Sequence, residues 1–108
     1  MNGKAWTEME ILQTLKVYVD IRDRGADKAA AVGRLAALLD RSRGSIEAAV
    51  MAPAKEDPLW RGERPHRGLT NTHAAALWKK YSKDLPGLVA EAARYEETLR
   101  TLRRKGRL

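Results

Sequence analysis

Apolar residues recur at spacings of three and four along most of the chain, a pattern that predicts helices rather than strands. The first helix is expected to start at Thr7, because Thr7 and Glu10 have the spacing of a capping box. Trp6 before this cap and Ile11 after it are placed to form a hydrophobic staple. Gly25 is a typical C-terminal stop. The apolar face between these signals comprises Ile11, Leu12, Leu15, Tyr18 and Val19.

The next segment predicts two short helices joined by a tight turn. One runs from Asp27 or Lys28 to Leu39, with a buried stripe of Val32, Leu35, Ala36 and Leu39. The other follows Ser42 as N-cap and is ended by Pro53; its apolar positions are Ile46, Ala49 and Val50. Two helices separated by about three residues have the dimensions of a helix-turn-helix.

Residues 53–69 contain three of the four prolines and two glycines, which predicts a long loop that is functional or mobile. Leu59 and Trp60 are expected to pin this loop to the core. Thr70 or Asn71 then caps a fourth helix, whose core positions are Ala74, Leu77, Trp78 and Tyr81. A fifth helix starts near Asp84, tolerates Pro86 in its first turn and continues to about Lys105. The fold class predicted is all-α.

The fifth helix carries apolar residues at alternating spacings of four and three, as in the a/d seam of a coiled coil. These residues are Leu88, Ala92, Tyr95, Leu99 and Leu102. The seam has two interpretations: the helix packs on its own domain, or it forms a homodimer. We therefore expect a helix-turn-helix domain with the fourth helix over residues 1–83, and a C-terminal helix with a basic tail over residues 84–108, packed on the domain or dimerising.

Composition adds constraints on the class of protein. A chain of 108 residues fits one domain, and the absence of cysteine excludes disulfides, thiolate zinc sites and a cysteine nucleophile. No apolar run approaches the roughly 20 residues of a membrane span, and the first turns lack the apolar stretch of a signal peptide. We expect a cytoplasmic protein without a membrane partner, associated with the nucleoid if it binds DNA.

Catalytic residues are scarce. His66 and His73 are the only histidines, and their spacing of seven fits no zinc-ligand pattern. No glycine-rich phosphate loop and no Gly-x-Ser-x-Gly motif is present. Ser42 and Ser45 are explained by helix capping. We therefore expect a protein that is not an enzyme and needs no metal or cofactor.

The net charge of +7 is concentrated in the C-terminal half of the chain. Residues 70–83 contain Lys79, Lys80 and Lys83 and no acid, and basic residues crowd the end of the chain. Such a distribution is typical either of a phosphate-binding surface or of a solvated helix face with a frayed tail.

In a helix-turn-helix, the N-terminal residues of the second helix approach DNA, where arginine can reach guanine or phosphate. Here that end carries Arg41, Ser42, Arg43 and Ser45, but Glu47 and the small residues after it make a poor base-reading face. We therefore expect double-stranded DNA to be bound mainly through phosphates. The contacts predicted are Arg41, Ser42, Arg43, Ser45, Lys79, Lys80, Lys83, Arg103, Arg104, Lys105 and Arg107. The alternative is a protein–protein interaction module that uses Glu47, Val50, Met51 and the Trp60 loop.

A set of short motifs resembles a known family. The first part, similar to Myb/SANT-like helix-turn-helix domains, is Trp6-Thr7-Glu8, Leu35-Ala36, Leu39-Asp40-Arg41-Ser42 and Ser45-Ile46. With Asp57-Pro58, Gly68-Leu69-Thr70-Asn71 and Leu77-Trp78-Lys79-Lys80-Tyr81, the set resembles the N-terminal domain of bacterial HNH-type restriction endonucleases. The resemblance covers roughly residues 5–82 and includes no nuclease segment. It implies a helical module that helps such nucleases engage DNA or assemble, or an adaptor or inhibitor of a restriction or phage component.

One departure from the family concerns the third helix. The family carries a lysine near the middle of this helix, whereas this chain has Ala48-Ala49-Val50 there. The difference weakens base reading by this helix and leaves phosphate contact as the expected mode of binding.

Overall fold

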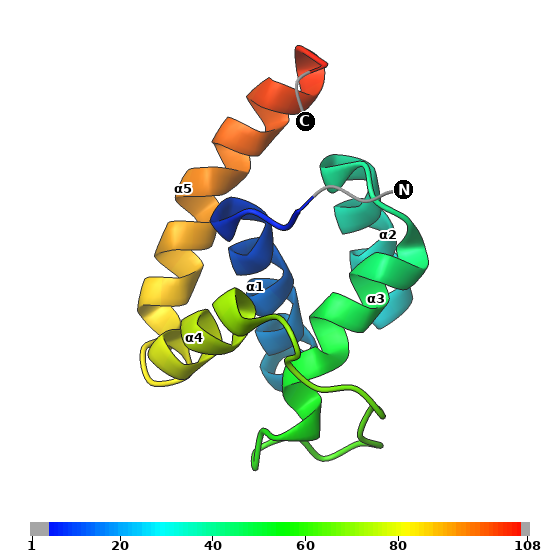
Figure 1. Ribbon diagram of the computed structural model, residues 1–108, viewed down its shortest axis with the longest axis vertical. Helices are drawn as coiled ribbons and strands as arrows, with labels where there is room; N and C mark the ends of the chain where they lie inside the picture. The colour runs from blue at the N-terminus through cyan, green and yellow to red at the C-terminus, as the bar shows by residue number, and fades with distance from the viewer. Residues whose placement is uncertain (1–4, 107–108) are drawn as a thin grey trace.

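The computed structural model describes residues 5–106, and within this range it contains α-helices, one 3₁₀ turn and no strand (Figure 1). The helices are α1 (Glu8–Arg24), α2 (Lys28–Leu39), α3 (Arg43–Met51), α4 (Thr72–Tyr81) and α5 (Leu85–Arg104). The 3₁₀ turn η1 spans Ala52–Lys55. The all-α prediction is confirmed for the described residues. Arg107, predicted as a DNA contact, lies outside them.

Local capping explains where the helices begin and end. The Glu10 N–H donates to Thr7 Oγ1 at 3.2 Å and the Thr7 N–H donates to Glu10 Oε1 at 3.0 Å, which completes the predicted capping box. Gly25 ends α1 in the left-handed region, at φ 68°. The other N-caps are Asp27, Ser42, Asn71 and Asp84. Asn71 is thus the cap of α4, rather than Thr70.

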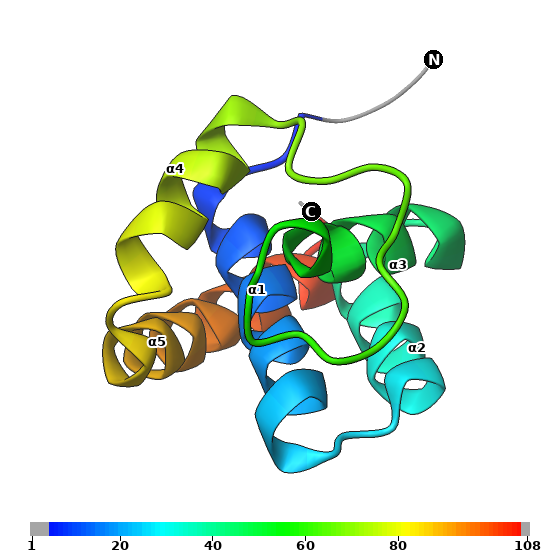
Figure 2. The same ribbon diagram turned by 90° about the horizontal axis from the view of Figure 1, so that it is seen from below.

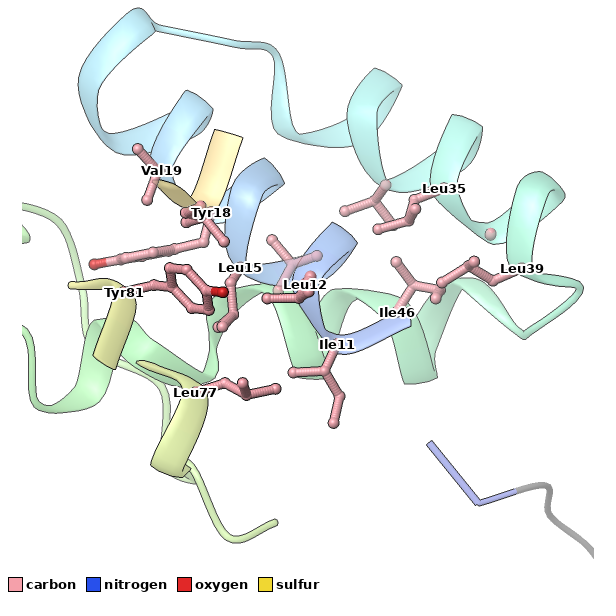
Figure 3. Packing of buried hydrophobic residues seen from close by; sticks show 14 of the residues in the cluster. Ile11, Leu12, Leu15, Tyr18, Val19, Leu35, Leu39, Ile46, Leu77 and Tyr81 are labelled. Carbon is pink, nitrogen blue, oxygen red and sulfur yellow. The ribbon is translucent and has the colours of Figure 1, made fainter. Parts of the chain in front are cut away.

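Helix α1 forms the centre of the fold, with α2 and α3 on one side and α4 and α5 on the other (Figures 1 and 2). Side chains from every helix meet around α1 in one core, part of which Figure 3 shows. Its largest fully buried members are Tyr18, Leu12, Leu15, Leu39, Ile46, Leu88 and Leu99. The apolar stripes predicted for the separate helices therefore pack together in one chain.

The seam of α5 packs within this chain. Leu88, Ala92 and Leu99 are buried in the core, and Tyr95 and Leu102 are half-buried. Gln13 Nε2 donates to the Ala92 carbonyl at 2.6 Å and joins α1 to α5. Of the two interpretations, packing on the domain is the one observed. Leu88, Ala92 and Leu99 are thus covered within one chain, and their role as dimer contacts stays a prediction.

The segment after α3 corrects a second prediction. Pro53 does not start the loop; it lies in the first turn of η1, where Ala52, Pro53 and Ala54 are all buried. Proline is tolerated there because the first residues of a helical turn have no internal partner for their N–H. The irregular segment therefore begins at Glu56 and crosses the fold between η1 and α4 (Figure 2).

This long loop is fixed by two side chains. Buried Asp57 accepts hydrogen bonds from Tyr18 Oη at 2.6 Å and Arg22 Nη1 at 2.7 Å, both on α1. Arg64 Nη1 donates to the carbonyls of Ala54 and Asp57, which closes the loop on itself.

Two apolar residues of the loop behave differently. The Trp60 ring lies 5.6 Å from the Tyr18 ring, as expected for a residue that pins the loop. Leu59, predicted to do the same, is 63% exposed; it is its backbone N–H, donating to Asp57 Oδ1 at 3.0 Å, that is fixed to the buried carboxylate.

Candidate nucleic-acid interface

The first predicted DNA contact, Arg41, is part of the protein interior. Its side chain is only 8% exposed, and its Nε lies 3.0 Å from Glu10 Oε2. The Arg41 guanidinium also donates to the Ala5 carbonyl at 2.9 Å and lies 4.1 Å from the centre of the Trp6 ring. Arg41 therefore holds the start of α1 against the turn between α2 and α3. Its role as a DNA contact stays a prediction, with most of the side chain engaged by Glu10 and Trp6.

Glu10 is the buried partner in this arrangement. Burial alone would raise the pKa of the Glu10 carboxyl, but the bonds from Arg41 and Thr7 outweigh it and hold the pKa below its ordinary value. The ion pair is thus charged at neutral pH. Sequence periodicity did not reveal it, since the two residues are 31 positions apart.

The leading end of α3 offers one exposed cation. Ser42 Oγ accepts the Ser45 N–H at 3.1 Å, which confirms Ser42 as the N-cap. Arg43 is exposed, and its Nη2 donates to the Ala29 carbonyl of α2 at 3.2 Å. A Cβ on Gly33 would lie 2.6 Å from Arg43 Nη1, so the glycine permits this side chain to lie across α2. Arg43 and the hydroxyl of exposed Ser45 remain accessible to a phosphate.

The residues predicted for a protein-interaction surface differ in exposure. Val50 is fully buried, and Met51 and Trp60 are partly buried against the core. Glu47 pairs with Lys28 at 3.0 Å and links α3 to α2. Of the four residues, Val50 is therefore closed to a partner, whereas Glu47 is exposed and Met51 and Trp60 are half-buried.

The lysines at the end of α4 are close together in the chain and exposed. Lys79, Lys80 and Lys83 are all exposed, on the last turn of α4 and in the turn before α5. Within residues 5–106 no carboxylate lies within ion-pair distance of any of them. Lys80 Nζ lies 5.0 Å from the centre of the Tyr81 ring. We call these three residues the lysine patch.

The basic end of α5 is a second and separate group. Arg103 Nε donates to the Ala37 carbonyl at 3.4 Å, so this end of α5 meets the end of α2. Arg104 and Lys105 are exposed, and neither has a carboxylate partner among the described residues. The lysine patch lies at the opposite end of α5 (Figure 1), about 30 Å away along a helix of this length.

Ion pairs elsewhere neutralise much of the remaining charge. Lys16 pairs with Asp20 at 2.7 Å, Arg94 with Glu91 at 3.1 Å and Arg100 with Glu96 at 2.6 Å. The cations that lack such a partner in the described part of the chain include Arg34, Arg61, Arg67, Lys79, Lys80, Lys83, Arg104 and Lys105. The positive field is therefore carried by these exposed residues.

The two histidines lie on different elements. His73 Nε2 is 3.5 Å from Glu8 Oε1 at the surface, whereas the His66 backbone carbonyl accepts a bond from Lys55. Across residues 5–106, no group of three or more histidine, aspartate or glutamate side chains is arranged to hold a metal ion. In the same range no helix combines the length and the apolar character needed to span a membrane.

No protein-family profile matches the chain, and comparisons with curated proteins and with solved structures give no significant match. The resemblance to the N-terminal domain of HNH-type endonucleases therefore stays a prediction based on the motifs quoted above.

Proposed function

We propose that the protein binds double-stranded DNA without catalysis, mainly through the phosphate backbone, on a Myb/SANT-like helix-turn-helix core formed by α1, α2 and α3. The observation that carries the proposal is the lysine patch: three neighbouring exposed cations with no carboxylate partner in residues 5–106. Lysine side chains placed in this way neutralise phosphates and release counterions from DNA. A role in regulation, restriction or phage defence is consistent with such binding.

The placement of α3 favours phosphate contact over base reading. Its leading end supplies Arg43 and Ser45, but Arg41 is held by Glu10. Further along α3, Glu47 and the alanines offer no donor for guanine, the base most often read by arginine or lysine. The affinity is therefore expected to depend weakly on DNA sequence and strongly on salt.

The experiment is a salt titration of binding to a short fluorescent duplex of mixed sequence, followed by anisotropy. One variant, K79A/K80A/K83A, removes the lysine patch. The matched control, K16A/R94A/R100A, removes the same three charges from residues that are already paired with acids. In the patch variant, the slope of the logarithm of the binding constant against the logarithm of the salt concentration should become shallower by about 0.9 for each phosphate contact removed.

The control separates a local contact from an effect of net charge. Both variants carry the same formal charge, so a contact at the lysine patch predicts a large loss only when the patch is removed. Equal losses in the two variants, or no binding of the wild type at low salt, would contradict the proposal.

A further inference from the structure

A groove of about 250 Å³ lies between α1, α3 and the last residues of the long loop. Its walls include Trp6, Leu15, Ala48, Ala49, Arg67 and Leu69. The hollow has a simple origin in the sequence, because the face of α3 that borders it carries small side chains where larger ones would fill the space.

The loop wall of the groove is held in place by the protein itself. A Cβ on Gly68 would lie 3.0 Å from Glu56 Oε1 and 3.2 Å from Lys55 Cδ, so the backbone there packs closely on the end of η1. Lys55 Nζ also donates to the His66 carbonyl, and Asn71 caps α4 where the groove ends. The shape of the groove is thus held by contacts within the chain itself, as expected of a small-molecule site.

The lining favours an apolar ligand with one negative charge. Alanine, leucine and isoleucine side chains and the Trp6 ring make most of the wall, and no carboxylate lines it. Arg67 is its one charged lining residue; it is exposed and has no acidic partner within residues 5–106. A planar ring packs well against an indole and small aliphatic side chains, and a guanidinium pairs with a carboxylate.

We propose that this groove binds a small aromatic carboxylate, with its ring against Trp6 and Ala49 and its carboxylate on Arg67. The volume lies just below the range of about 300–1,000 Å³ of sites for drug-sized ligands, which suits an acid of one or two rings. The groove meets the start of α4, whereas the lysine patch lies at its end. Ser45, a proposed phosphate contact at the start of α3, also lines the groove, so a bound ligand lies beside that contact and at the other end of α4 from the lysine patch.

The test titrates the isotope-labelled protein with indole-3-propionate and with its neutral amide, read by NMR chemical shifts. We expect saturable binding of the acid with a Kd of about 0.1–1 mM, the strength usual for so small a ligand. The shifts should centre on Ala48, Ala49, Gly68 and Leu69. The amide should bind about ten-fold more weakly, because it lacks the charge-assisted bond to Arg67.

Three variants test whether the acid binds in the groove. Arg67→Gln should remove the difference between acid and amide, and Ala48→Leu should fill the groove and abolish binding. Ala76→Leu makes the same change at an exposed position of α4 outside the groove, and should bind as the wild type does. The proposal is overturned by equal affinity for acid and amide, by normal binding in a folded Ala48→Leu protein, or by shifts that centre on the lysine patch.

Discussion

Tyr18 and Asp57, 39 residues apart, are joined by a hydrogen bond of 2.6 Å from the phenol to a carboxylate oxygen. Burial and the neighbouring carboxylate both raise the pKa of Tyr18, so the phenol stays protonated and donates this bond. Burial would raise the pKa of Asp57 as well, but bonds from Tyr18, the Leu59 N–H and Arg22 hold it below its ordinary value. The network makes the long loop part of the folded core.

The first prediction concerns the contribution of Asp57 to stability. Asp57→Ala should lower the free energy of unfolding by about 3–5 kcal/mol, because it leaves the buried Arg22 charge and the Tyr18 hydroxyl without this partner. Asp23→Ala is the matched control: it removes another carboxylate bonded to Arg22, but an exposed one, and should cost about 0–1 kcal/mol. Urea unfolding measures both, and similar losses would contradict the role given to Asp57.

The second prediction is a loss of stability in acid. The pKa values of Glu10 and Asp57 are lower in the folded protein than their ordinary values of 4.5 and 3.8. When the pH falls below about these values, the unfolded chain therefore binds more protons than the folded protein does. Stability is then complete near neutral pH and falls as the pH drops through this range, by up to about 1.4 kcal/mol per pH unit for each group.

Urea unfolding at several pH values between neutral and acidic measures the slope of the free energy of unfolding against pH. Exposed Glu97 has no ion-pair partner within residues 5–106, so Glu97→Gln should leave the slope unchanged. Glu10→Gln should flatten it, since the titrating carboxyl is gone. A stability that stays constant in acid would show that neither buried carboxylate is held in its charged form.

Helix positions could be predicted from the sequence because they depend on contacts within one turn. The Thr7–Glu10 box, the Ser42 cap and Gly25 are all local signals, and α1, α2 and α5 begin and end at or next to the predicted residues. The role of Arg41 could not be predicted, because its partner Glu10 is distant in sequence and already had a local role in the capping box.

Two further features depend on tertiary structure. A repeat of apolar residues such as Leu88 and Leu99 gives the face of a helix but not what covers it, so packing on α1 and pairing with a second copy predict the same pattern. The groove beside α3 was also missed, since Ala48 and Ala49 indicate only a weak base-reading face until the loop is placed beside them.

The third prediction separates Arg41 from Arg43, which are neighbours in sequence but differ in environment. Arg41→Ala should lower the free energy of unfolding by about 3 kcal/mol, because Glu10 loses its buried partner. Arg43→Ala should change stability by no more than about 0.5 kcal/mol, yet lower the salt slope of DNA binding by about 0.9 if the side chain contacts a phosphate. Loss of stability in Arg43→Ala alone would reverse these assignments.

The fourth prediction tests the seam of α5. Leu99→Ala should destabilise the protein by about 2–5 kcal/mol, whereas Val89→Ala, at a position 36% exposed on the same helix, should cost far less. Because the seam is buried within one chain, the melting temperature should not depend on protein concentration, and light scattering should give the same mass for the wild type and for folded Leu99→Ala. A dimer held by this seam would instead melt at higher temperature when concentrated. In that case Leu99→Ala would produce folded particles of half the mass, a result that the packing of Leu99 in the core of a single chain does not allow.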